Sequence, residues 1–382
     1  MSMLELITKA SATSNESPSD SQYPIVLNPD PILLNLNPKT NDSFINRVEG
    51  WKISELDAQV IELAQKFYKN LKIKLKNPNS FTKVEFVNML NLYLEKSKES
   101  SGISIGIEPK DEGFSNAFIR KFGFLMGEAV LGLVIEACFV FEIWEILETL
   151  IEGGLVNGSV YKDLVGKLIE KRRADLVCLS VKYVSDLQVS DVLSVLRFFL
   201  CAPKDGYGSM VDVRNEWERQ AVSAIEIAAD KSLGVKKLNK AKDAAVLLVM
   251  AHDEFTTSEL CLHYLISSSN VDDVILSACI GKLNGLEIMS FVRYLKKWLV
   301  KYQKFPEACL SGKSSQKGVE SVPSLENVTK CFGLVIDEHF SSLVMHLEFV
   351  EEVKSIELVV NSLASEARIC CTLANLCASL KN

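Results

Sequence analysis

The sequence predicts an all-α protein, built as an irregular, α-solenoid-like stack of helical hairpins with a disordered N-terminal arm. Downstream of Lys52, apolar residues recur three or four positions apart, which is the period of an amphipathic helix. Five of the ten prolines fall in this part of the chain, and each stands between helical stretches. The 382 residues, 48% of them hydrophobic and 24% charged, can bury a substantial core.

Residues 1–50 are expected to form the disordered arm. Serine and asparagine are frequent between residues 11 and 46, and the other five prolines occur there, so this stretch cannot sustain a helix. Two short apolar runs, 25–27 and 32–36, interrupt the polar sequence. They could clip the arm onto its own domain or dock in extended form on a partner.

Residues 51–100 are expected to form a helical hairpin. Ser54 and Asp57 have the spacing of a capping box, and helical periodicity continues from there towards Pro78. The second helix is expected at 80–96. Residues 101–114 are polar and contain three glycines and a proline, so they are interpreted as a linker.

Residues 115–382 are expected to form one α-helical scaffold domain. The stretch 115–151 is apolar on several faces, as in one long helix or two abutting helices, and Gly153 and Gly154 supply its C-terminal cap. Thr256 and Glu259 form another capping box. Further helices are expected at 159–171, 173–184, 190–201, 212–231, 235–252, 256–267, 271–282, 285–304, 324–337 and 348–380.

The last of these helices has the most regular pattern. Its apolar residues step alternately by four and three, which is typical of a helix-packing seam. Flanking positions are also apolar, so the stripe is too wide for a two-stranded coiled coil, and a multi-helix interface is predicted. The packing partner could belong to the same chain or to another subunit. The candidate interface residues are Phe349, Val353, Ile356, Val360 and Leu363.

The helix at 285–304 carries a basic stripe. Its opposite face is centred on Trp298 and is expected to be buried, so the cations are expected to project to solvent or to a partner. RNA phosphate or an acidic protein could dock there, or the stripe could be an ordinary solvated face. A second lysine-rich stretch, 66–83, admits the same interpretations. The candidate partner- or RNA-binding residues are Arg293, Lys296, Lys297, Lys301 and Lys304.

Composition limits the other function classes. A net charge of −7 and a pI near 5.4 give no global attraction to nucleic acid, so any contact must be local. Four glutamates interrupt the most apolar stretch, 129–151, so no membrane span is expected. Residues 1–10 lack a cationic stretch followed by an apolar block, so no secretory leader is expected. Most of the ten cysteines lie inside apolar helical patterns, which suggests reduced core thiols and a cytosolic or nuclear compartment.

Catalytic and cofactor motifs are also missing. Gly312, Lys313 and Ser314 match the end of a phosphate loop, but Glu307 stands where its first glycine is required. His252 and His263, with a nearby cysteine, lack the spacing of a metal site. No enzyme activity, cofactor, metal or small-molecule substrate is therefore expected, although a helical active-site pocket lined by these two histidines stays as a third hypothesis.

The C-terminal third resembles the helical C-terminal modules of small-subunit processome subunits. The upstream helices from about residue 159 are similar to those of plant-type relatives of nucleolar protein eleven. The resemblance lies in the order of helical segments, and in the pair Trp298 and Leu299 that ends a leucine-rich helix before a loop. Family members commonly carry a β-propeller before this module, whereas this chain has no regular strand pattern. The matching segments are 258–266, 274–283, 286–298 and 325–332.

The resemblance implies a non-enzymatic scaffold in ribosome biogenesis, located in the nucleolus or nucleus. Its partners would be protein subunits of a pre-ribosomal complex, with indirect or local contact to pre-rRNA. The alternative is a cytosolic helical-repeat adaptor for protein–protein interaction, without an RNA role.

Overall fold

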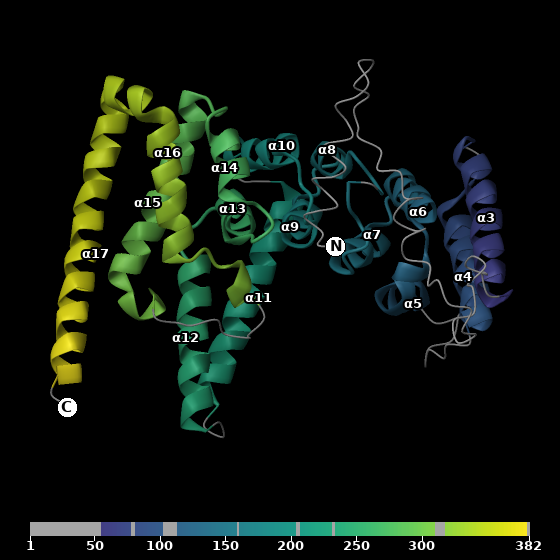
Figure 1. Cartoon of the computed structure of the whole chain (residues 1–382), viewed down its shortest axis with the longest axis horizontal. Coiled ribbons are helices and arrows are strands. Elements are labelled where there is room, and N and C mark those ends of the chain that lie inside the picture. The colour runs from purple at the N-terminus through teal and green to yellow at the C-terminus, as the bar shows by residue number, and fades with distance from the viewer. Residues whose placement is uncertain are drawn as a thin grey trace, which may run out of the picture. The chain divides into compact units, whose positions relative to one another are not determined.

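The described part of the chain is all-α, which confirms the predicted fold class there. In a computed structural model it comprises fifteen α-helices and three short 3₁₀-helices, with no strand among the described residues (Figure 1). The expected arm at 1–50, the cap residue Ser54 and most of the expected linker at 101–114 lie outside these residues. The described ranges are 55–77, 81–101, 113–158, 160–203, 207–230, 234–309 and 318–379.

The first two described helices, α3 (Glu55–Leu75) and α4 (Lys83–Ser101), form the predicted hairpin. Phe67 of α3 stacks on Tyr93 of α4, with ring centroids 4.4 Å apart. Leu71 is fully buried. The hairpin is joined to the following helices through packing of α3 on α6 and of α4 on α5.

The apolar stretch 115–151 is divided more finely than expected. It contains a short 3₁₀ segment and three helices rather than one or two. At Gly123, an added Cβ would lie 2.3 Å from a side-chain carbon of Leu155, so glycine permits a close approach there. Glu142 adopts a left-handed conformation, with φ of 52°, and ends a second helix. The elements are α5 (Phe114–Phe122), η2 (Gly123–Leu125), α6 (Glu128–Phe141) and α7 (Trp144–Glu152).

Gly153 and Gly154 end α7 as predicted, with Gly154 at a φ of +64°. Beyond them, α8 packs on α9 and α10, α9 packs on α11 and α13, and α10 packs on α14, which in turn packs on α16. Neighbouring helices pack in succession as in a solenoid, but the pairs α9 with α13 and α10 with α14 join segments far apart in the sequence, so the stack is irregular. The elements are α8 (Leu164–Glu170), α9 (Ala174–Tyr183), α10 (Val189–Leu200), α11 (Gly208–Ala229), α12 (Val235–His252), α13 (Thr257–Ser267), α14 (Asp273–Ile280), α15 (Gly285–Lys304), η3 (Pro306–Cys309), η4 (Val319–Ser321), α16 (Leu325–Met345) and α17 (Leu347–Ser379).

Local capping fixes where several of these helices begin. At the start of α13, the Thr256 backbone N–H donates to Glu259 at 2.7 Å, and the Glu259 N–H donates back to the Thr256 hydroxyl at 3.3 Å. The predicted capping box is therefore confirmed. Asn284 and Glu287 make the same reciprocal pair at the start of α15.

Trp298 lies at the centre of the C-terminal core, as predicted. Its side chain is fully buried, and its ring centroid lies 5.0 Å from that of Phe255 and 4.8 Å from that of His263. Tyr302, one turn later, donates its hydroxyl to the Pro323 carbonyl at 2.5 Å. These contacts hold α15 against α13 and against the segment that leads into α16.

Candidate partner-binding surface

The basic stripe of α15 is less exposed than expected. Lys301 is only 4% exposed; its ammonium group lies 5.3 Å from the Phe255 ring centroid and 3.5 Å from a Glu254 carboxylate oxygen. The expectation that all five cations project to solvent or a partner is therefore wrong for Lys301. The cause is the turn before α13, where Glu254 has a φ of +61° and places Phe255 against α15.

Three other cations of the stripe are paired within the chain. The Lys297 ammonium lies 2.8 Å from Glu259, which also caps α13. Lys296 and Arg293 both bind Glu352 of α17, at 2.7 and 3.3 Å. Hydrogen bonding from Lys296 holds the pKa of the Glu352 carboxyl below its ordinary value.

Lys304, at the end of α15, is exposed and has no ion-pair partner within the described ranges. The stripe thus joins α13, α15 and α17 electrostatically. Binding of RNA or an acidic protein by these five residues stays a prediction.

The first half of α17 packs within the chain. Phe349 and Ile356 are buried, Val353 and Leu363 are half-buried, and Val360 is 39% exposed. Their helix lies against α15 and α16. Of the two arrangements left open by the sequence, packing within the chain therefore applies to this half.

The second half of α17 continues the same seam without a packing partner in the described chain. Ala364 and Ala367 are exposed, and so are Cys370 and Cys371. Figure 1 shows α17 at the edge of the packed helices, with its C-terminal end reaching past α15. Glu366 and Arg368 are the charged residues between positions 358 and 373. An apolar helical surface with little charge is typical of a protein-binding face.

Sequence reasoning missed a second apolar line on α17. Leu358, Ile369 and Leu373 are 74%, 59% and 54% exposed. They are spaced by eleven and four residues, which places them on one side of a helix, about 120° around the helix from the seam. That spacing was legible in the sequence. The pairing of Glu352 with two cations could not be predicted from the sequence, because those cations belong to another helix.

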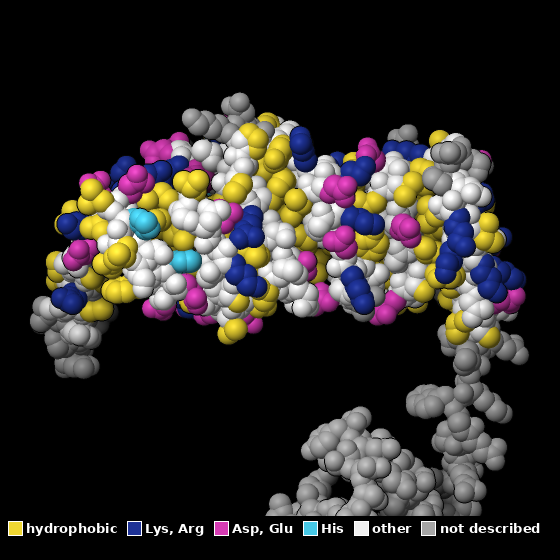
Figure 2. Space-filling view, turned by 90° about the horizontal axis from the view of Figure 1, so that it is seen from above, with side chains coloured by type: hydrophobic (Ala, Val, Ile, Leu, Met, Phe, Trp, Pro, Cys, Tyr) yellow, Lys and Arg dark blue, Asp and Glu magenta, His cyan; other side chains and the backbone are white. Residues whose placement is uncertain are grey.

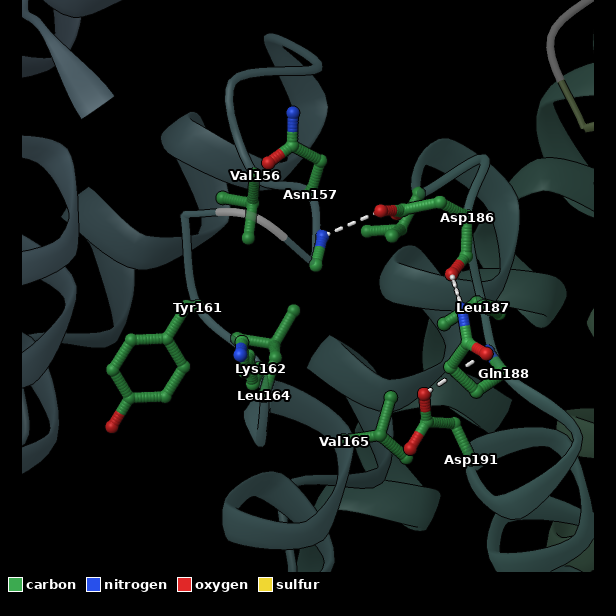
Figure 3. Close-up of a pocket in the computed structure, with 12 residues that line it drawn as sticks. Val156, Asn157, Tyr161, Lys162, Leu164, Val165, Asp186, Leu187, Gln188 and Asp191 are labelled. Atoms are coloured by element: carbon green, nitrogen blue, oxygen red, sulfur yellow. Dashed lines mark hydrogen bonds between the residues drawn. The ribbon is translucent and has the colours of Figure 1, made fainter. Parts of the chain in front are cut away.

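A separate pocket of about 310 Å³ lies between the loops that precede α8 and α10 (Figure 3). Its two carboxylates both accept hydrogen bonds from backbone N–H groups of the chain. Asp186 accepts a hydrogen bond from the Gly158 N–H at 2.7 Å, and Asp191 accepts from the Gln188 N–H at 3.1 Å. Val165 and Leu187 contribute to its apolar lining. These polar groups fix two loops, and the pocket presents no nucleophile paired with a base.

His263 does not line a cleft. It is fully buried, its Nδ1 lies 2.9 Å from the Tyr294 hydroxyl, and its Nε2 lies 3.0 Å from the Ala251 carbonyl oxygen. Burial lowers the pKa of the imidazole to about 3. The hypothesis of a pocket lined by His252 and His263 is therefore wrong for His263, and the ring nitrogens are engaged in packing the core.

Acidic and basic side chains alternate over most of the face in Figure 2, where Lys and Arg gather more densely at the end formed by α3 and α4. Each helix in the described ranges is too short or too polar to cross a lipid bilayer. No protein-family model matches the chain, and no curated protein is significantly similar to it.

Proposed function

We propose that this chain is a non-enzymatic helical scaffold of ribosome biogenesis, which joins a pre-ribosomal complex through the distal half of α17. The observation that carries the proposal is the uncovered apolar surface of this half, formed on one side by the continuation of the seam that packs on α15 and α16, and on another side by Leu358, Ile369 and Leu373. The seam therefore has partner helices along the first half of α17 and none among the described residues along the second half.

The chemistry of this surface suits a helix of another protein. Ile369 and Leu373 offer large apolar side chains on one side of distal α17, and the small side chains of Ala364 and Ala367 allow close approach of a helix on the opposite side. Affinity in such contacts comes chiefly from a few well-buried apolar side chains. Lys304, exposed at the end of neighbouring α15, would steer an acidic partner rather than bind it tightly.

The choice of a pre-ribosomal complex rests on the resemblance of residues 258–332 to the helical modules of processome subunits. The described helices follow the segment order of that resemblance, with α13, α14, α15 and α16 in succession. Partners in this assembly would be protein subunits for pre-rRNA transcription and processing, and the expected location is the nucleolus.

The test is affinity purification of the tagged full chain from cells, compared with the double variant I369S/L373S. Both side chains are exposed, so the variant should fold normally. The amount of pre-ribosomal protein recovered with it should fall at least about tenfold. The matched control is V274S/L286S, which changes two exposed apolar side chains, 77% and 84% exposed, on other helices. Recovery of the same pre-ribosomal proteins by both variants would refute the role of α17.

The second candidate is a cytosolic adaptor that uses the same face of α17. It is favoured by the internal pairing of Arg293, Lys296 and Lys297, because this pairing reduces the charge available for RNA. Two results would establish the adaptor instead. The tagged chain would be excluded from the nucleolus, and I369S/L373S would recover fewer of the cytosolic proteins that co-purify with the wild type.

A further inference from the structure

The start of α12 carries a group of lysines that the fold does not use. Lys236, Lys237 and Lys240 are exposed, and none of their ammonium groups makes an ion pair or hydrogen bond with a described residue. Their spacing of one, three and four positions places them within about 100° of one side of the helix. Leu238 lies about 150° around the helix from the middle of this group and is half-buried, and α12 packs on α11.

This arrangement is unfavourable for α12 itself. Backbone dipoles give the first turn of a helix a partial positive charge, so Lys236 and Lys237 are repelled by the helix that carries them. Lys236 and Lys240 are also like charges one turn apart. The first acid that follows, Asp243, makes no ion pair with them in the described chain. A local conflict of this kind is expected where a residue serves a ligand rather than the fold.

Several other basic groups of the described chain are stabilised by their surroundings. Lys72 and Lys74 lie in the last turn of α3, where positive charge is favourable, and they lie over the rings of Tyr68 and Phe81. The cation of Arg173 pairs with Asp175. The α15 stripe is largely paired, as described above. The lysines of α12 differ because neither the helix dipole nor an acid stabilises them.

We propose that Lys236, Lys237 and Lys240 bind the phosphate backbone of double-stranded RNA. Lysine ammonium groups bind phosphate as compact, hydrated point charges, and Lys236 and Lys240 stand about 6 Å apart along the helix axis. No aromatic side chain occurs among the described residues from 222 to 243, so the site lacks the stacking surfaces that recognise single-stranded bases. Contact with the backbone of a duplex needs no such surface.

Two other classes of partner fit this face less well. Protein interfaces are depleted in lysine and prefer arginine for ion pairs, whereas this group contains no arginine. A membrane surface would require large apolar side chains beside the lysines, but Val235 lies about 100° from Lys236 around the helix, away from the other two.

The choice of RNA over DNA rests on the proposed function in ribosome biogenesis. The lysine group itself lies on α12, and the proposed protein-binding face lies on α17. Loss of pre-ribosomal partners in I369S/L373S tests one proposal, and binding of purified RNA tests the other, so either can fail while the other holds.

The experiment measures fluorescence anisotropy of a labelled 20-base-pair RNA duplex with the purified full chain, at about 50 to 200 mM salt. In K236Q/K237Q/K240Q, affinity at the lowest salt is expected to fall by about tenfold or more, and the slope of log K against log salt by about 2 to 3. The matched control, K121Q/K162Q/K354Q, removes three exposed lysines elsewhere and should bind as the wild type does. Circular dichroism should show unchanged helix, since removing lysine from a first turn does not weaken it.

Equal binding by the α12 variant and the control would overturn the proposal, as would failure of the wild type to bind the duplex. Competition by polyglutamate of the same charge, as effective as unlabelled RNA duplex, would indicate an acidic protein instead. If the wild type sediments with phosphatidylserine vesicles, the α12 variant does not, and neither binds RNA, the lysines bind a membrane surface instead. Tenfold tighter binding of a DNA duplex of the same sequence would also exclude RNA as the ligand.

Discussion

The carboxylate of Glu352 on α17 lies 2.7 Å from the ammonium group of Lys296 on α15. Arg293 approaches the same carboxylate at 3.3 Å, so one acid binds two cations of the stripe. The acid and Lys296 are 21% and 29% exposed, which screens their interaction less than a fully exposed pair. Glu352 thus both fixes α17 on the core and withdraws two cations from outside partners.

Replacing Glu352 with Gln should lower the free energy of unfolding by about 1 kcal/mol, because two charge-assisted contacts are lost while the shape is kept. Urea unfolding followed by circular dichroism measures this. The pKa of Glu352 is lowered in the folded state, so its stabilisation is present above its ordinary pKa and disappears as the pH falls through the lowered value. Glu357→Gln, an exposed change on the same helix, should have little effect. Equal stability of the two variants would contradict the pairing.

The sequence was most informative where local signals decide the structure. The bounds of α12 and α15 agree with the prediction because Gly234 and the box of Asn284 with Glu287 mark their starts. It was least informative where two elements meet. The left-handed Glu142 that divides the apolar stretch follows from how α6 and α7 fold back on each other, and nothing local requires a turn there.

The same distinction applies to the candidate surface. Helical periodicity correctly placed Trp298 in the core and the five cations opposite or beside it. Periodicity could not reveal that Phe255 covers Lys301 or that Glu352 reaches Lys296, because these contacts depend on the docking of α13 and α17. A charged stripe read from sequence gives the direction of its side chains but not their partners.

Trp298→Ala should destabilise the C-terminal helices by about 3 to 5 kcal/mol, because it removes a fully buried indole from the contacts with Phe255 and His263. Chemical unfolding monitored by helicity, together with hydrogen exchange of α13 and α15, measures the loss and locates it. Leu286→Ala on the same helix changes a side chain that is 84% exposed, and should shift stability by less than about 0.5 kcal/mol. A similar small shift for Trp298→Ala would show that the indole is not central.

His263 should make the chain sensitive to mild acid. Its pKa is about 3 when folded, against an ordinary value of 6.5, so the unfolded chain binds one more proton between these values. Stability is therefore complete above about pH 6.5 and should fall by up to about 1.4 kcal/mol per pH unit below it. His263→Gln should reduce the slope of unfolding free energy against pH by about one proton. Leu286→Ala, at an exposed position without a titratable group, should leave the slope unchanged, and the same slope in all three proteins would contradict the burial.

The cysteines should react with iodoacetamide in the order set by their burial. Cys370 and Cys371 on α17 are exposed and should be alkylated first. Cys201 is exposed but should react more slowly, because partial burial and the Glu287 carboxylate raise the pKa of its thiol and the thiolate is the nucleophile. Burial raises the pKa of Cys331 to about 12, so this thiol should react only after unfolding in guanidinium. Brief labelling followed by peptide mass spectrometry gives the order. Early labelling of Cys331, or protection of Cys370 and Cys371 in the isolated chain, would contradict the packing of α16 or the exposure of distal α17.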